Sequence, residues 1–113
     1  MRRRLFIGWR IAVVWLLVAG VSLPAQAADP VRGRVLYEAR CNLCHGTSVH
    51  SRDPRLARDF DAVRAQVNRW AGETGTGWTP AEIDDVSVYL NRRYYRFRCP
   101  AALCGNEQAS VAR

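Results

Sequence analysis

Residues 41–45 read Cys-Asn-Leu-Cys-His, two cysteines spaced C-x-x-C with a histidine directly after the second. This string is the attachment pattern of a c-type haem. Two thiols three residues apart reach the two vinyl groups on one edge of a porphyrin, and the next imidazole then falls beneath the iron. We therefore predict one covalent haem c, attached through Cys41 and Cys44, with His45 as the proximal iron ligand.

The same cysteines suit three other kinds of site less well. A thioredoxin-like redox motif sits near a βαβ pattern, which this chain lacks. A zinc site needs four ligands, and no second pair in the sequence closes a plausible tetrahedron around Cys41 and Cys44. A purely structural disulfide would not require His45. The haem interpretation is the one that uses all three side chains.

The first 27 residues have the order of a secretory signal peptide. Met1–Arg4 is basic, residues 11–21 form an uncharged and mostly apolar run, and Ala25-Gln26-Ala27 gives a small-x-small processing site. The alternative is a retained membrane anchor, since a span needs roughly 20 apolar residues. Arg10 interrupts that run, so we predict cleavage after residue 27 or 28 and a periplasmic location, which also suits covalent haem attachment.

Charge gives little support to a nucleic-acid partner. The 113 residues carry 17 basic and 10 acidic side chains, a net charge of +7, and every basic residue is arginine. Residues 1–27 hold four of the arginines and none of the acids, so the remaining 86 residues carry 13 arginines against 10 acids, or +3. A chain of that size has a marginal core, which a bound cofactor would complete.

Hydrophobic spacing predicts three helices and no strand. The first covers about Pro30–Cys41 and the second about Phe60–Trp70, where Gly72 and the glycines after it end the pattern. The apolar residues at helical spacing in the first helix are Val31, Val35, Leu36 and Ala39, and those in the second are Phe60, Val63, Val67 and Trp70.

The third helix has the clearest start. Thr79 is a suitable N-cap, Pro80 takes the first helical position, and Glu82 completes a capping box. Trp78 and Ile83 are placed to form a hydrophobic staple across that cap. The predicted buried face consists of Ile83, Val86, Tyr89 and Leu90, and the predicted last turn contains Arg92 and Arg93.

Two stretches around the haem motif resemble class I cytochromes c. Gly-Arg-Val-Leu-Tyr at 33–37 is similar to that family's N-terminal helix, and Asp-Val-Ser-Val-Tyr-Leu at 85–90 is similar to its C-terminal helix. The resemblance covers roughly Pro30–Tyr95. It implies an all-α cytochrome c-like domain at 28–96, wrapped around one covalent haem, that transfers one electron at a time between periplasmic or membrane-bound redox partners.

The family's usual sixth iron ligand is a methionine, and Met1, within the predicted leader, is the only methionine here. His50 is the leading candidate for the distal position, although the five residues from His45 extend at most about 17 Å. Alternatively, His50 and Arg52 bind a haem propionate, or His50 lies on the surface. Asn68 is a weaker candidate. Without methionine, we expect a lower reduction potential than is usual in the family.

An open or weakly occupied sixth position defines the alternative function, a gas-binding or sensing haem protein. An enzyme would need an acid–base group near the iron. His50 is the only candidate for a peroxidase-like role, and no supporting constellation accompanies it. We therefore predict an electron carrier that is not an enzyme and that has redox proteins, not nucleic acid or a small substrate, as its partners.

The last segment, 97–113, is predicted to be a tail held by a local disulfide. Cys99 and Cys104 are spaced C-x4-C with Gly105 in the place where a haem motif has histidine, so a second haem is not expected. An oxidising compartment favours a disulfide between them, with a redox-active pair as the alternative. We expect the arginines and aromatics at 92–98 to guide an acidic redox partner or to contact the haem propionates. The alternative is a solvated helix end with its aromatics folded back on the core.

Overall fold

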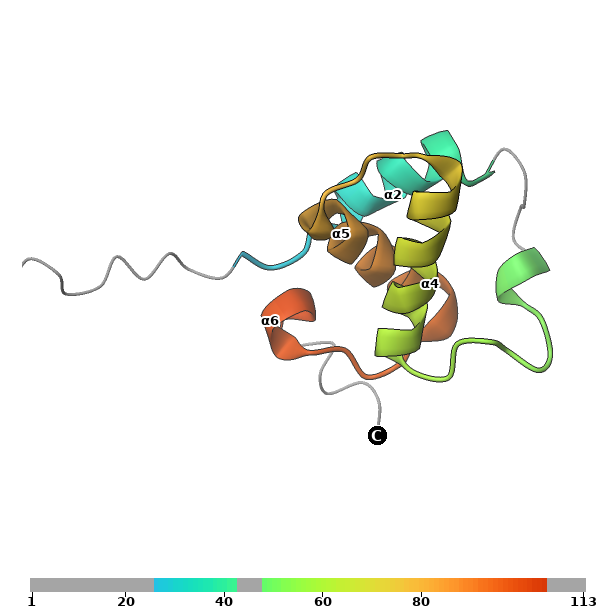
Figure 1. Ribbon diagram of the computed structural model, residues 1–113. Coiled ribbons are helices and arrows are strands. Elements are labelled where there is room, and N and C mark those ends of the chain that lie inside the picture. The colour runs from blue at the N-terminus through green and yellow to red at the C-terminus, as the bar shows by residue number, and fades with distance from the viewer. Residues whose placement is uncertain (1–25, 43–47, 106–113) are drawn as a thin grey trace, which may run out of the picture.

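The computed structural model describes residues 26–42 and 48–105, and every regular element within them is helical (Figure 1). The main helices are α2 (Pro30–Arg40), α4 (Phe60–Thr74) and α5 (Pro80–Leu90). The short elements are a 3-10 turn η1 (Ser48–His50), a π-helical turn η2 (Asn91–Tyr95) and α6 (Ala101–Cys104). The prediction of an all-α domain with about three main helices is confirmed.

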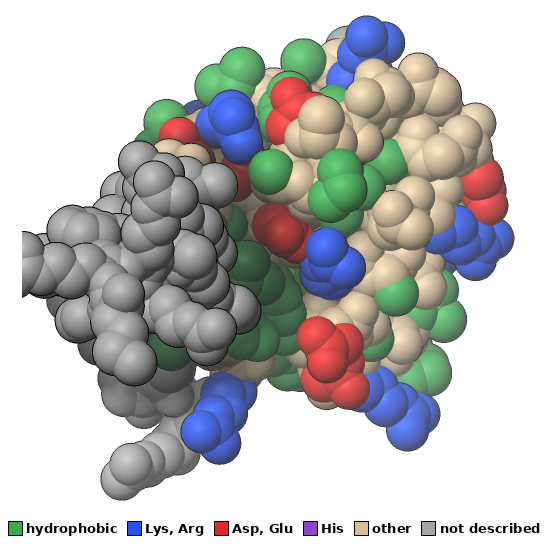
Figure 2. All heavy atoms as spheres, turned by 60° about the vertical axis from the view of Figure 1, so that its left-hand side comes forward, with side chains coloured by type: hydrophobic (Ala, Val, Ile, Leu, Met, Phe, Trp, Pro, Cys, Tyr) green, Lys and Arg blue, Asp and Glu red, His purple; other side chains and the backbone are tan. Residues whose placement is uncertain are grey.

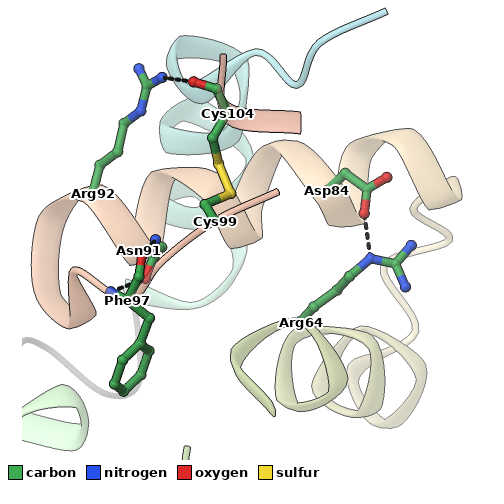
Figure 3. Close-up of a disulfide and its surroundings, with 7 residues drawn as sticks. All are labelled: Arg64, Asp84, Asn91, Arg92, Phe97, Cys99 and Cys104. Carbon is green, nitrogen blue, oxygen red and sulfur yellow. Dashed lines mark hydrogen bonds and ion pairs between the residues drawn. A yellow bond between two sulfur atoms is a disulfide. The ribbon is translucent and has the colours of Figure 1, made fainter. Parts of the chain in front are cut away.

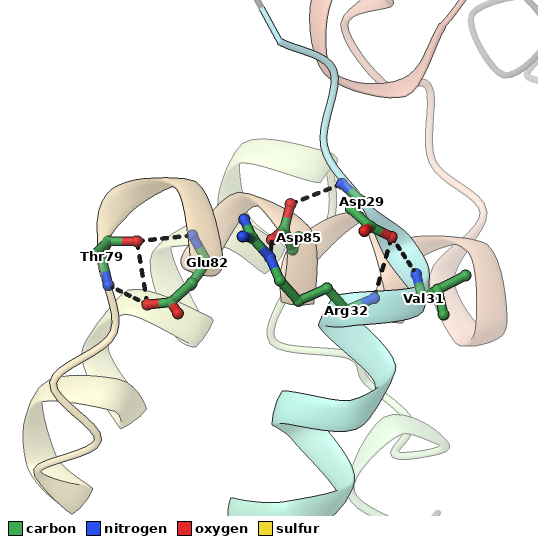
Figure 4. Close-up of polar contacts among 6 residues, drawn as sticks. All are labelled: Asp29, Val31, Arg32, Thr79, Glu82 and Asp85. Carbon is green, nitrogen blue, oxygen red and sulfur yellow. Dashed lines mark hydrogen bonds and ion pairs between the residues drawn. The ribbon is translucent and has the colours of Figure 1, made fainter.

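The crossing of α2 and α5 depends on one glycine. Gly33 lies so close to α5 that a Cβ atom built on it would stand 2.0 Å from the backbone oxygen of Asp85. The Asp85 side chain accepts a hydrogen bond from the backbone N–H of Asp29 (2.7 Å) and another from the Arg32 guanidinium (Figure 4). Asp29 in turn caps α2 by accepting from Val31 and Arg32. The two helices are thus joined through backbone proximity and one buried carboxylate.

The buried face of α2 differs from the predicted one. Val31 and Val35 are 73% and 62% exposed, whereas Gly33 and Tyr37 are buried. The pattern of apolar residues misplaced the face because the closest contact with α5 is made by a glycine, which has no side chain to contribute to an apolar stripe. Tyr37, which lies outside the predicted series of apolar residues, fills this part of the core.

Helix α4 runs one turn further than predicted. It begins after the N-cap Asp59, whose side chain accepts a hydrogen bond from the Ala62 N–H (2.7 Å), and it continues through Gly72. It ends at Gly75, which adopts the left-handed conformation with φ of 65° that favours glycine. Gly72 is therefore an interior residue of the helix. The positive φ angle at Gly75 sets the end of the helix.

Helix α5 begins as predicted and ends earlier. Thr79 and Glu82 form both hydrogen bonds of the capping box, with Pro80 in the first turn (Figure 4). The α-helix ends at Leu90 and passes into η2, so Arg92 and Arg93 lie in a π-helical turn instead of a final α-helical turn.

The π-helical turn is closed by a buried asparagine. The Asn91 side chain donates to the Phe97 carbonyl and accepts from the Phe97 N–H, each at 2.9 Å (Figure 3). Arg96 ends the turn in the left-handed conformation, with φ of 58°. This arrangement turns the chain back along α5 and presents consecutive tyrosines, Tyr94 and Tyr95, toward the end of α2.

The C-terminal segment folds back over α5 and the start of the described chain. The Ala28 N–H donates to the Leu103 carbonyl (3.0 Å), and Arg92 donates to the Cys104 carbonyl (3.4 Å). Cys99 and Cys104 are joined as a disulfide with their Cα atoms 6.0 Å apart (Figure 3). Both are buried and pack with Phe60 and Val88 in a second small core. Residues 97–105 of the predicted tail thus belong to the fold.

Charges are interspersed on the face shown in Figure 2, where arginine side chains lie beside acidic ones. The ion pairs given for the described residues are Arg32–Asp85, Arg34–Glu38, Arg64–Asp84 and Arg69–Glu73. Each of these pairs places a carboxylate beside an arginine, which offsets the charge of that arginine locally. None of the helices in the described part of the chain is both long enough and apolar enough to cross a membrane.

Candidate haem pocket

A cavity of about 250 Å³ lies between α4, α5, the end of α2 and the segment 49–57. The wall of the cavity is mainly apolar and includes core residues of α4 and α5. These apolar lining residues are Val49, Leu56, Ala57, Val63, Val67, Trp70, Ala71, Trp78, Val86 and Leu90. A cavity of this lining is suited to a flat apolar group, because the wall offers contact to carbon and little to water.

Cys41 lies in the wall of this cavity. It is half-buried and forms the C-cap of α2, where its N–H donates to the Tyr37 carbonyl at 2.8 Å. Cys44 and His45, predicted to complete the haem motif, lie outside the described residues. The structure therefore brings the first cysteine of the motif to the cavity that the core helices enclose.

Trp70 and Leu56 form a part of the cavity wall that is exposed to solvent. Trp70 is 46% exposed and Leu56 is 76% exposed, although both line the cavity. Large apolar side chains at the mouth of an apolar cavity mark a surface that a bound group would cover. The apolar stripe predicted for α4 therefore contacts two regions. Val63, Val67 and Trp70 line the cavity, whereas Phe60, the first residue of the stripe, is buried in the second core.

Three arginines, Arg40, Arg52 and Arg55, also line the cavity and are exposed. None of the ion pairs given for the described chain involves them. Guanidinium groups bind carboxylates well. An apolar wall edged by arginines and joined by Cys41 fits haem c, which is an apolar macrocycle with two carboxylates that is attached through cysteine.

His50 lies in the cavity wall and not on the surface. The residue is 7% exposed, and both of its ring nitrogens contact tyrosine hydroxyls. Hydrogen bonds join Nε2 to the Tyr37 hydroxyl at 2.5 Å and Nδ1 to the Tyr95 hydroxyl at 2.9 Å. The Tyr94 ring stacks on the imidazole, with centroids 4.4 Å apart and planes 17° from parallel.

Burial keeps the partner hydroxyls protonated. Burial raises the pKa of Tyr37 well above its ordinary value, and burial also raises the pKa of Tyr95, partly offset by the Arg55 guanidinium 5.4 Å from its ring. A protonated hydroxyl both donates and accepts. Each tyrosine hydroxyl can therefore accept a hydrogen bond from a protonated nitrogen of His50 or donate one to an unprotonated nitrogen.

The disulfide stands apart from this pocket. Neither Cys99 nor Cys104 lines the cavity, and both pack in the second core. This position separates the two cysteine pairs of the sequence, because Cys41 contacts the cavity and the C-terminal pair pins the tail.

Comparison with known proteins identifies the family. No family model and no solved structure matches the chain. A cytochrome c6 of Gloeothece citriformis is 30% identical over 94 residues, an alignment that covers 69% of this chain and 86% of that protein. The chain belongs to the c-type cytochromes. The protein's cofactor is accordingly covalently bound haem c with its iron, and the protein is an electron carrier, not an enzyme.

Proposed function

We propose that this c-type cytochrome carries one electron at a time between redox partners outside the cytoplasm. Cys41 and Cys44 attach the single haem, and His45 supplies the proximal nitrogen. The observation that carries the proposal is the apolar cavity with Cys41 in its wall. When bound there, haem supplies the exchange between ferric and ferrous iron, and the chain supplies attachment, orientation and exclusion of water.

The apolar lining supports electron transfer without other chemistry. Val63, Val67 and Val86 are almost fully buried beside the cavity, so water has little access to that side of the site. A dry wall limits solvent reorganisation and influences the potential through the local dielectric. Arg40, Arg52 and Arg55 orient the group by binding its carboxylates and present positive charge to an acidic redox partner.

A potentiometric titration of the purified haem protein tests this function. We expect a reversible one-electron transition at a potential below that of cytochromes with histidine–methionine coordination, because no methionine follows Met1. His45→Ala should keep the covalent haem, through Cys41 and Cys44, but change the visible spectrum, because the proximal nitrogen is lost. A transition that is irreversible, or that has the high potential of histidine–methionine coordination, would contradict the proposal.

The second candidate function is binding of a small gas at the sixth iron position. The observation that favours it is that tyrosine hydroxyls engage both ring nitrogens of His50. Ligation of iron by His50 would require one nitrogen to leave its tyrosine, so the prediction of a His50 ligand stays a prediction. Rapid carbon monoxide binding to the ferrous protein would support an open site. A low-spin spectrum that does not change when carbon monoxide is added would support a strong internal ligand at the sixth position.

Membership of the family supports export, and we propose that residues 1–27 are the signal peptide and are removed. The mass of the intact protein recovered from the periplasm tests this, since cleavage at 27 or 28 leaves about 86 residues. A membrane fraction that retains the full-length chain would show instead that the segment serves as an anchor. Membrane-bound redox partners remain compatible with either outcome.

A further inference from the structure

His50 joins three elements that are distant in the sequence. It ends η1, and its hydrogen-bond partners are Tyr37 on α2 and Tyr95 in η2. Tyr94, also in η2, adds a stacked ring. The imidazole therefore holds the end of α2 against the turn that follows α5, on the side of the cavity where Cys41 lies.

The hydrogen bonds of this cluster are difficult to give up. A buried polar group that loses its hydrogen-bond partner destabilises the fold, because it has given up its contacts with water. If His50 moved to bind iron, the hydroxyl of Tyr37 or Tyr95 would lose the nitrogen that it contacts. Tyr37 is 6% exposed, so water has little access to replace that contact.

The cluster also separates the cavity from a polar hollow. Tyr37 lines the cavity on one side and, on the other, a hollow that includes Arg34, Glu38, Arg93 and Tyr94. Arg93 lies over the ring of Tyr94, 5.2 Å from its centroid. Tyr37 lines both spaces, His50 and Tyr95 line the cavity, and Tyr94 lines the hollow. The contacts of His50 with these tyrosines therefore form a wall between the apolar and polar spaces.

We propose that His50 is a positioning residue of the haem pocket, which holds this wall through Tyr37 and Tyr95 and does not bind the iron. The inference rests on the proposed function, since it assigns a role toward the haem attached at Cys41. With the wall in place, water from the polar hollow is kept from the cavity. Opening the wall would admit water, which stabilises the more highly charged ferric state and lowers the potential.

Five single variants of the haem protein separate positioning from ligation. His50→Gln keeps a side chain that donates and accepts, and His50→Leu removes both functions while retaining bulk. Tyr37→Phe and Tyr95→Phe remove one hydroxyl each, and Tyr94→Phe is the matched control that keeps the stacked ring. For each we would measure covalent haem content, the ferric spectrum, the reduction potential and the carbon monoxide association rate.

If His50 positions the wall, His50→Gln and Tyr94→Phe keep the wild-type ferric spectrum and potential. His50→Leu and Tyr37→Phe both lower the potential and raise the carbon monoxide association rate. The double variant with His50→Leu and Tyr37→Phe should shift the potential and the association rate little more than either single variant, because both substitutions remove the same contact. Tyr95→Phe, which leaves the Tyr37 contact in place, should shift the potential in the same direction and provides the test if His50→Leu does not fold.

The inference is overturned if His50→Gln converts the ferric protein from low-spin to high-spin while Tyr37→Phe and Tyr95→Phe leave the spectrum and potential unchanged. That result would make His50 the iron ligand. It is also overturned if both tyrosine variants match wild type in every measurement. Failure of the proposed function is a separate result, seen as wild-type protein that lacks covalent haem.

Discussion

Tyr37 combines a buried ring with a hydroxyl that is hydrogen-bonded to His50 Nε2 in the wall of the cavity. Burial raises its pKa, whereas an unfolded tyrosine loses its proton near pH 10. Above that pH the unfolded chain binds fewer protons than the folded chain at this position. Ionisation of Tyr37 therefore favours unfolding as the pH rises above about 10, whereas this ionisation does not change stability near neutral pH.

We predict that the free energy of unfolding falls as pH rises from about 10, the ordinary tyrosine pKa, and that Tyr37→Phe reduces this fall. Burial also raises the pKa values of Tyr89 and Tyr95, so part of the fall should remain. Chemical denaturation of the haem protein across the alkaline range measures it. An identical pH dependence in Tyr37→Phe and wild type would contradict this role of burial.

At the scale of elements, the two helical glycines have opposite surroundings. A Cβ on Gly33 would stand 2.0 Å from an Asp85 backbone atom, whereas a Cβ on Gly72 would meet nothing within 4 Å. Alanine is a better helix former than glycine by about 1 kcal/mol. The effect of adding one methyl group is therefore decided by what each helix packs against.

We predict that Gly33→Ala destabilises the protein by about 1–3 kcal/mol, since overpacking must separate α2 from α5. Gly72→Ala is the matched control in α4 and should stabilise by about 0.5–1 kcal/mol. Urea denaturation of both variants measures the difference. Equal effects of the two substitutions would show that the helix crossing is not as close as the structure places it.

These elements also show which features could be predicted from sequence. The capping box of Thr79 and Glu82 was predictable because both partners lie within one turn. The buried face of α2 was not, since a close backbone contact at Gly33 leaves no apolar side chain to detect. The Tyr37–His50–Tyr95 cluster joins residues 13 and 45 positions apart, and only the fold brings them together.

At the scale of the whole molecule, the C-terminal disulfide lies in the second core, outside the cavity that Cys41 lines. Reducing Cys99–Cys104, or replacing both with serine, should lower the free energy of unfolding by about 2 kcal/mol in the chain-entropy model. The visible spectrum and potential should not change, because neither cysteine lines the cavity. Denaturation with and without reductant, with thiol counting, tests this. A changed haem spectrum would show coupling that the structure does not contain.

The central claim is that the one haem is attached at Cys41 and Cys44. Trypsin cleaves after arginine, so Cys41 and Cys44 lie on the peptide 41–52. The disulfide pair, Cys99 and Cys104, lies on the peptide 99–113. Mass spectrometry of the digested haem protein measures which peptide carries haem. We predict the added mass of one haem on 41–52 and none on 99–113. Haem on 99–113, or no covalent haem on 41–52, would contradict it.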